Sequence, residues 1–200
     1  MMDIEHAIVP RVRSISLRSI GVFQELDVVL SPEKNFIRGE NGIGKSTLLW
    51  SAAHAGNPLW KPMHHRCADA YSKGAIAVEF LPAGPAPRSR FMLPAWAKTN
   101  GVSMSDSALL QLEYWLSATP PDHALLFDDD ILASLDFQKR DSALAMIAGA
   151  ECQILAVVPQ NLTREELPLK GITGLMLRVV QADGGGATLE TEPFGPERTK

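Results

Sequence analysis

The sequence predicts an α/β domain with a mainly parallel central sheet and antiparallel hairpins at its edges. Strand-like and helix-like segments alternate through the middle of the chain, which is typical of parallel strands joined by helices. Near both ends, β-favouring segments follow one another across short turns, which indicates antiparallel pairs. The 200 residues suit a single domain, expected over 1–200, with a divergent segment at 56–104.

The expected elements follow from local patterns and from the residues that end them. Two β-favouring segments, 13–18 and 22–30, flank a break at Ser19-Ile20-Gly21 and predict a hairpin. Apolar spacing and stop signals such as Gly56-Asn57-Pro58 predict the helices, with Ser105 as a candidate N-cap. Helices are expected at 45–55, 106–118 and 137–148. Further strands are expected at 35–38, 75–81, 89–93, 123–127, 153–158, 175–180 and 187–190.

Bulk composition is that of an ordinary soluble globular chain, with 46% hydrophobic and 21% charged residues. No stretch approaches the ~20 apolar residues of a membrane span, so no membrane partner is expected. The chain begins with acidic residues where a signal peptide would carry bases. Cys67 and Cys152 are too few for a disulfide framework, which indicates a reducing, cytoplasmic compartment.

The charge is unevenly distributed along the chain. The net charge of −4 argues against a globally basic nucleic-acid binder. Residues 1–100 hold twelve Lys/Arg and eight Asp/Glu, whereas residues 101–200 hold seven and fifteen. Two interpretations of the early arginines are open: a local basic face, or solvated strand edges, which is favoured. These arginines are Arg11, Arg13, Arg18 and Arg38.

A glycine-rich segment between a strand and a helix carries the strongest functional signal. It reads Gly39-Glu40-Asn41-Gly42-Ile43-Gly44-Lys45-Ser46-Thr47 and matches G-x-x-x-x-G-K-[ST]. Without side chains at the glycines, backbone N–H groups can curl around a phosphate, aided by the helix N-terminus. Lys45 would reach the β- and γ-phosphates, and the Ser46 hydroxyl would ligate Mg²⁺. ATP and Mg²⁺ are therefore the expected ligands, held by all nine residues.

A second motif follows the apolar segment Ala124-Leu125-Leu126-Phe127, which has the form of a buried strand ending in acids. A carboxylate at such a strand end can hold Mg²⁺, and a neighbouring one can orient or deprotonate water. Three consecutive aspartates, 128–130, leave the register open. Leu135-Asp136 begins six residues after Asp129, which bears on the register. Asp136 is also a candidate N-cap of the next helix.

The combined motifs resemble those of ABC-type ATPases, particularly the RecF and SMC branch. The resemblance rests on Ile15–Phe23, on the Gly-Glu-Asn-Gly spelling of the loop, and on the acids followed by Leu135-Asp136. It implies an ABC-ATPase-like P-loop fold, with Asp129 beside Mg²⁺ and Asp130 and Lys45 as catalytic groups. The alternative register shifts these acidic roles to Asp128 and Asp129. The resemblance also implies a homodimer or a complex with another protein, and indirect work on DNA in repair, mobile-element biology or phage defence.

Several features of that family are missing. No Gln lies between Gln24 and Gln111, and Met104-Ser105-Asp106-Ser107-Ala108 stands where the signature is expected. Ser105 either donates to a γ-phosphate across a dimer or only caps the helix. Pro159-Gln160-Asn161 replaces the switch His, so Gln160 is left as a candidate phosphate contact. Asp130 is one methylene shorter than the usual Glu, and a ~1 Å misplacement can cost on the order of a hundredfold in rate.

Three functional hypotheses follow. The first is a nucleotide-dependent switch in which ATP-Mg²⁺ promotes dimerisation or docking and slow hydrolysis resets it. The second is an ATPase, a hydrolase completed by a partner chain. The third is a structural module with a vestigial nucleotide site.

A zinc site is a weaker alternative for the divergent segment. His54, His64, His65 and Cys67 are of zinc-binding types, but their spacing fits no closed motif, and an irregular surface segment is favoured.

Overall fold

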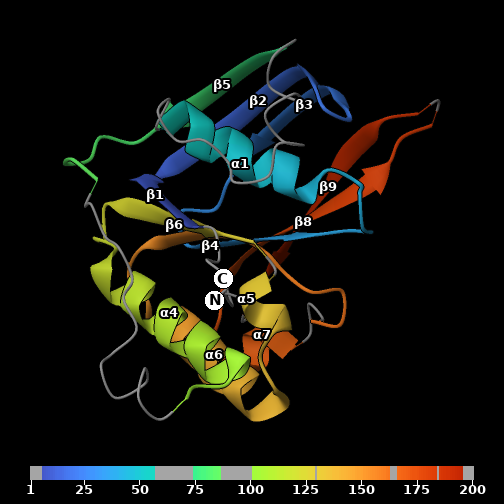
Figure 1. The fold of residues 1–200 in the computed structure, drawn as a ribbon. Helices are drawn as coiled ribbons and strands as arrows, with labels where there is room; N and C mark the ends of the chain where they lie inside the picture. Colours follow the sequence, from blue (N-terminus) through green and yellow to red (C-terminus); the bar gives the residue numbers. More distant parts are fainter. Residues whose placement is uncertain are drawn as a thin grey trace, which may run out of the picture.

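The chain folds into four stacked layers (Figure 1). The computed structural model describes residues 6–56, 74–86, 101–128, 130–162, 166–183 and 185–195. A three-stranded sheet forms the first layer, and helix α1 (Lys45–Gly56) lies between it and a six-stranded sheet. Helices α4 (Met104–Ala118) and α6 (Phe137–Gly149) cover the opposite face of the larger sheet. The central strands β6 and β7 of the six-stranded sheet are therefore buried on both faces.

The larger sheet has the strand order β1-β6-β7-β4-β8-β9. The strands β6, β7, β4 and β8 are mutually parallel, whereas β1 and β9 are antiparallel to their neighbours. The bounds are His6–Pro10 for β1, His123–Phe127 for β6, Gln153–Val157 for β7, Lys34–Arg38 for β4, Gly174–Gln181 for β8 and Ala187–Phe194 for β9. The expected mainly parallel sheet is confirmed, as is an antiparallel hairpin at one edge.

The sequence had predicted antiparallel hairpins at the edges of this sheet. The N-terminal hairpin, however, does not lie at its other edge. Its strands β2 (Val12–Ile20) and β3 (Phe23–Val29) join β5 (Ala75–Phe80) in a separate antiparallel sheet of order β3-β2-β5. The edge beside β6 is taken by β1. The buried side chains of β2 and β3 pack instead in one core with α1. The strand expected at 89–93 lies outside the described residues.

Two short helices complete the described elements, α5 (Asp130–Ala133) and α7 (Glu166–Leu169). Helix α4 begins earlier than expected, and Ser103, not Ser105, is its N-cap, because the Ser103 hydroxyl accepts from the Asp106 amide at 3.1 Å. Asp136 caps α6 through the Lys139 amide, as the sequence indicated. No helix in the described part of the chain is long and apolar enough to cross a bilayer.

The two cores alternate along the parallel strands. Phe36 packs in the core beneath α4 and α6, whereas Ile37 packs in the core around α1. Leu125 and Leu126 of β6 divide in the same way. Since successive side chains of a strand point to opposite faces, a strand buried on both faces needs a continuous apolar run. This explains why β6 and β7 lack the polar alternation of the outer strands.

A buried amide joins the two sheets. Gln153, at the start of β7, accepts from the Val12 amide at 2.7 Å and donates to the Val12 carbonyl at 2.8 Å. It also donates to the Ser31 carbonyl at 2.7 Å. Its side chain is only 1% exposed, so no water replaces these partners. The amide therefore fixes the chain between β1 and β2 to the larger sheet.

We expect Gln153→Met to destabilise the fold by about 3 kcal/mol, because three hydrogen bonds are lost and backbone groups of Val12 are left buried without partners. Chemical denaturation at constant pH measures this change. Gln24→Met, at an exposed position of β3, is the matched control and should change stability by less than about 0.5 kcal/mol. Equal effects of the two substitutions would contradict the bridging role.

A histidine at the start of β1 is packed rather than solvated. The His6 ring stacks on Trp115 of α4, with ring centroids 4.1 Å apart and an interplanar angle of 16°. Burial lowers the pKa of His6 from its ordinary 6.5 to about 4, because the packed site disfavours the charged ring. The folded protein therefore keeps His6 neutral over a pH range in which the unfolded chain takes up a proton.

Stability should consequently fall as the pH falls from about 6.5 to about 4, by up to about 3 kcal/mol. The lowered carboxylate pKa values of Asp106 and Asp136 act only at still lower pH, below their ordinary 3.8. Denaturation series at several pH values measure the slope. His6→Phe retains a ring against Trp115 and should flatten the profile; an unchanged slope would exclude His6 as its source.

Candidate functional site

The carboxyl ends of the four parallel strands meet at one edge of the larger sheet. The segment 39–44 follows β4 there, the aspartates follow β6, and residues 159–161 follow β7. Ligand sites of parallel α/β sheets lie at this edge. The topology thus brings together the glycine-rich loop, the acidic strand end and Gln160, which the sequence had singled out separately.

The glycine-rich loop connects β4 directly to α1 and has the backbone that its glycines predict. Gly39, Gly42 and Gly44 have φ values of 158°, 79° and 109°, and the values at Gly42 and Gly44 favour glycine. A Cβ at Gly44 would lie 2.5 Å from Cγ2 of Val22 and 3.1 Å from the Phe23 ring. The N-terminal hairpin therefore presses against the loop at Gly44.

Lys45 closes the loop on itself. Its ammonium group donates to the carbonyls of Gly39 at 3.1 Å and Glu40 at 2.9 Å, and its side chain is mostly buried. These carbonyl oxygens are at the distance at which phosphate oxygens would accept from the same ammonium. Ser46 and Thr47 follow in the first turn of α1. The residues present thus fit a bound phosphate chain.

Gln160 and Arg38 connect the end of β7 to the same loop. The Gln160 amide donates to the Gly39 carbonyl at 3.3 Å, so this oxygen accepts from Gln160 and from Lys45. The Arg38 guanidinium donates to the Gln160 carbonyl at 2.8 Å. Gln160 therefore lies at the loop, as expected of a candidate phosphate contact. The sequence had indicated Arg38 only as a member of a possible basic face; its hydrogen bond to Gln160 was not predicted, although its place directly before Gly39 was a signal.

The acidic strand end is only partly described. β6 is fully buried along its length, and Asp128 follows it in a partly buried position. Asp129, the expected Mg²⁺ ligand, lies outside the described residues. Asp130 is the first residue of α5, and only its backbone is described. The choice between the two registers of the acids remains a prediction.

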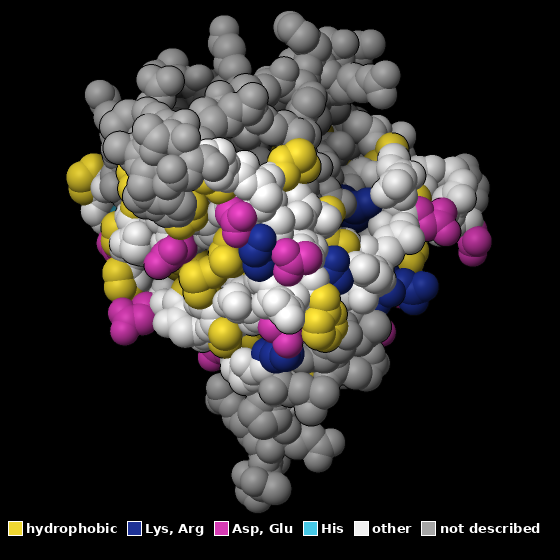
Figure 2. All heavy atoms as spheres, turned by 60° about the horizontal axis from the view of Figure 1, so that its bottom comes forward, with side chains coloured by type: hydrophobic (Ala, Val, Ile, Leu, Met, Phe, Trp, Pro, Cys, Tyr) yellow, Lys and Arg dark blue, Asp and Glu magenta, His cyan; other side chains and the backbone are white. Residues whose placement is uncertain are grey.

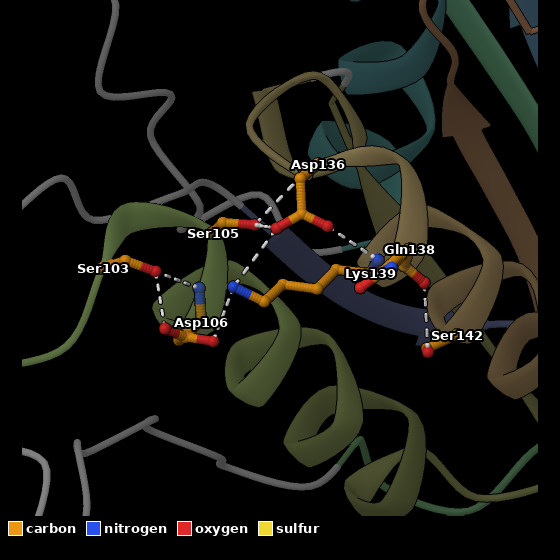
Figure 3. Close-up of polar contacts among 7 residues, drawn as sticks. All are labelled: Ser103, Ser105, Asp106, Asp136, Gln138, Lys139 and Ser142. Carbon is orange, nitrogen blue, oxygen red and sulfur yellow. Dashed lines mark hydrogen bonds and ion pairs between the residues drawn. The ribbon is translucent and has the colours of Figure 1, made fainter.

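The start of α4 is occupied by a network of polar side chains (Figure 3). The Ser105 hydroxyl donates to Asp136 at 3.2 Å and accepts from the Asp136 amide at 3.2 Å. The Lys139 ammonium lies between the two carboxylates, 2.7 Å from Asp106 and 3.3 Å from Asp136. Ser105 therefore does not cap α4, and its hydroxyl links α4 to the start of α6 by hydrogen bonds.

The charged side chains of this network stabilise one another's ionised forms. The Lys139 ammonium and the Ser103 hydroxyl hold the pKa of Asp106 below its ordinary value. The pKa of Asp136 is also lowered, chiefly by the Lys139 amide, and the pKa of Lys139 is raised, chiefly by Asp106. The negative charge that Asp106 brings to the signature position is therefore paired with a cation. The contribution of Lys139 was not predicted from the sequence, although its spacing from Asp136 places both in one helical turn.

The early arginines do not form one basic face. Arg13 pairs with Glu79 at 2.8 Å and Arg18 with Asp27 at 2.7 Å, both on the smaller sheet, as exposed strand residues. Arg38 belongs to the larger sheet. On a different side of the molecule, with the bottom of Figure 1 turned forward, Figure 2 also shows cationic and anionic side chains next to one another. Arg13 and Arg18 are therefore solvated, as favoured, but they lie on the central strand of the smaller sheet and not at its edge.

The zinc-capable residues are divided by the limits of the description. His54 belongs to α1, whereas His64, His65 and Cys67 lie outside the described residues. Among the residues that are described, no group of three or more metal-binding side chains occurs. Cys152 is a free, buried cysteine whose thiol pKa is raised by burial.

Comparisons with known proteins add a fold likeness only. No protein-family profile matches the chain, and no curated protein does. Among solved structures, the SMC head domain from Thermotoga maritima is similar at 11% identity, with 92% of this chain and 98% of that chain covered and a TM-score of 0.42. At this level of similarity the comparison carries no functional argument, and the site must be argued from its own geometry.

Two glycine substitutions test the geometry of the loop. We expect Gly44→Ala to destabilise the protein by more than Gly42→Ala, because both residues have positive φ but only Gly44 is enclosed. At Gly42 an added Cβ meets nothing within 4 Å, so a cost of about 1 kcal/mol from the backbone alone is expected. Thermal and denaturant unfolding measure the difference. Equal losses would show that the hairpin does not press on the loop.

Proposed function

We propose that this protein is an ATP-binding switch of the ABC-ATPase type, in which ATP-Mg²⁺ promotes pairing with a second copy or docking on another protein. Hydrolysis of the bound ATP is slow and resets the switch. The protein functions in the cytoplasm, and its work on DNA is indirect.

One observation carries this proposal. The Lys45 ammonium is held inside the loop by the carbonyls of Gly39 and Glu40, at 3.1 and 2.9 Å. Among the described residues, the acceptors of this largely buried ammonium are backbone carbonyls. Such a cation is suited to exchange them for phosphate oxygens, which carry full negative charge. Positive φ at Gly42 and Gly44 supports the same function, since these conformations allow N–H groups to line the loop.

The residues of the proposed site have different roles in binding ATP, holding Mg²⁺ and activating water. The loop from Gly39 to Thr47 holds the phosphates, and Lys45 contacts the terminal ones. Ser46 and Asp129 hold Mg²⁺, which neutralises phosphate charge when bound. Asp130 orients or deprotonates the attacking water.

Slow hydrolysis follows from the groups that this chain lacks and from how α4 begins. Gln160 contacts the loop but carries no charge, in contrast to the switch His expected there. The Ser105 hydroxyl is bonded to Asp136 in this structure, so it would have to leave that partner to donate to a phosphate of a second copy. Such an exchange makes pairing conditional on nucleotide.

A partner-completed ATPase is the second candidate. The specific observation in its favour is the network of Asp106, Asp136 and Lys139, which occupies the start of α4 with charges that satisfy one another. A second copy then has little to offer the terminal phosphate, and a different protein would supply the missing groups.

Lys45→Ala tests the proposal. The ammonium is the principal cation of the loop, so we expect ATP affinity to fall at least tenfold, with a loss on the order of 2 kcal/mol. Titration calorimetry with ATP-Mg²⁺ measures this. Lys170→Ala removes a lysine that pairs with Asp141 away from the loop, at 2.9 Å, and should bind ATP as the wild type does.

Two further readouts separate the candidates. Sedimentation with and without ATP-Mg²⁺ should show nucleotide-dependent pairing in the wild type and none in Lys45→Ala. Phosphate release should be slow in the isolated chain. Fast, Lys45-dependent turnover by the chain alone would overturn the switch, and absence of ATP binding at millimolar concentration would favour a structural module with a vestigial site.

A further inference from the structure

A cavity of about 620 Å³ lies beside the glycine-rich loop. Gly39, Glu40 and Ile43 form its border on the loop side, and Gln160 borders it from the end of β7. β8 and β9 contribute the rest of its wall, including Arg178 and Glu192. A volume of this size is in the range of small-molecule sites, and it exceeds what a lone phosphate ion fills.

Two arginines stand next to each other in this cavity. Arg38 of β4 and Arg178 of β8 are direct partners in the register of these parallel strands. Phe36 and Met176, two residues earlier on each strand, both pack in the core beneath α4 and α6. Because side chains alternate along a strand, Arg38 and Arg178 point to that same face. Like charges at neighbouring positions of adjacent strands are unfavourable unless something compensates them.

In the part of the chain that the structure describes, the hydrogen-bond and ion-pair partners of the two guanidinium groups compensate this repulsion only weakly. Arg38 donates to the Gln160 carbonyl, a neutral acceptor. Arg178 meets Glu190 at 3.4 Å, with the two side chains 59% and 52% exposed, so this pair is long and solvated. Each guanidinium has five N–H donors, and within the described part of the chain Arg38 and Arg178 each donate one side-chain hydrogen bond. A pair of guanidinium groups matches the oxygens of a phosphate group.

Other groups of the cavity narrow the ligand further. The amides of Gln160 and Gln181 add donors, whereas Glu40 and Glu192 are acceptors only. Their negative charge opposes a bare polyanion, and the Glu40 carboxylate can accept from a hydroxyl or amino group. The lining therefore fits a molecule that carries one phosphate together with such groups, as a mononucleotide or a sugar phosphate does.

We propose that Arg38 and Arg178 form a second phosphate-binding site, in the cavity beside the loop, for the phosphate group of a small phosphorylated molecule. The two arginines of this site are distinct from Lys45, although the cavity shares Gly39 and Glu40 with the contacts of the Lys45 ammonium. The site holds its ligand without a nucleotide on the loop. Two sources supply this chemistry: a free phosphorylated molecule, or the orthophosphate released when ATP is cleaved on the loop.

The test uses the full chain with AMP and orthophosphate as probes, and binding is measured by calorimetry and by the shift of the melting temperature. Arg178→Met is the principal variant, because this exposed side chain can be removed with little effect on folding. AMP affinity should fall about ten- to a hundredfold, as expected for loss of a charge-assisted contact. Arg38→Met should have a similar effect.

Two controls separate this site from the loop. Arg13→Met removes an ion-paired arginine of the smaller sheet and should leave AMP affinity unchanged. Lys45→Ala should lower ATP affinity at least tenfold but leave AMP or orthophosphate bound. Tighter binding of AMP than of orthophosphate identifies a phosphorylated molecule as the source, and equal binding identifies the released phosphate.

The proposal is overturned if neither probe binds at millimolar concentration, or if binding is lost in Lys45→Ala and retained in Arg178→Met. The proposed ATP switch is judged by different data, since it depends on ATP binding to the wild type and on the lower ATP affinity of Lys45→Ala.

Discussion

The architecture depends on how two sheets are held on opposite sides of one helix, and the buried Gln153 amide supplies the polar part of that connection. Val12 receives a donor and an acceptor from this side chain, at 2.8 and 2.7 Å. The smaller sheet is thereby anchored to β7 while its apolar face covers α1. A buried amide with all these partners fixes one relative position, whereas apolar packing alone tolerates sliding.

This arrangement positions the glycine-rich loop at the carboxyl ends of the parallel strands. Because the smaller sheet is anchored, Val22 and Phe23 lie against Gly44, and the loop is confined between that hairpin and β8 near Val179. The confined loop in turn positions Lys45 against its own carbonyls. The loop conformation is thus set by its packing within the fold, and a loop ordered in this way would reduce the ordering cost of the proposed phosphate binding.

Charge at the two ends of the site is managed in different ways. At the start of α4, Asp106 and Asp136 share Lys139, and each lowers or raises the pKa of its partner in the direction that stabilises the charged forms. In the cavity beside the loop, Arg38 and Arg178 lie side by side, and their partners in the described part of the chain compensate their charges only weakly. The first arrangement is self-contained, and the second is suited to a ligand. A nucleotide switch with an additional phosphate site is consistent with both.

The sequence by itself determined the local features: the strand–loop–helix unit at Gly39–Thr47, the buried strands β6 and β7, and the cap of α6 at Asp136. These features depend on residues adjacent in the chain, on apolar runs and on the positions of glycines, so the local sequence pattern is sufficient to predict them. Only the tertiary structure decided that the N-terminal hairpin forms its own sheet, that Ser105 bonds Asp136 across 31 residues, and that Arg38 neighbours Arg178. Strand order, register and helix packing are set by non-local burial, which no short segment specifies.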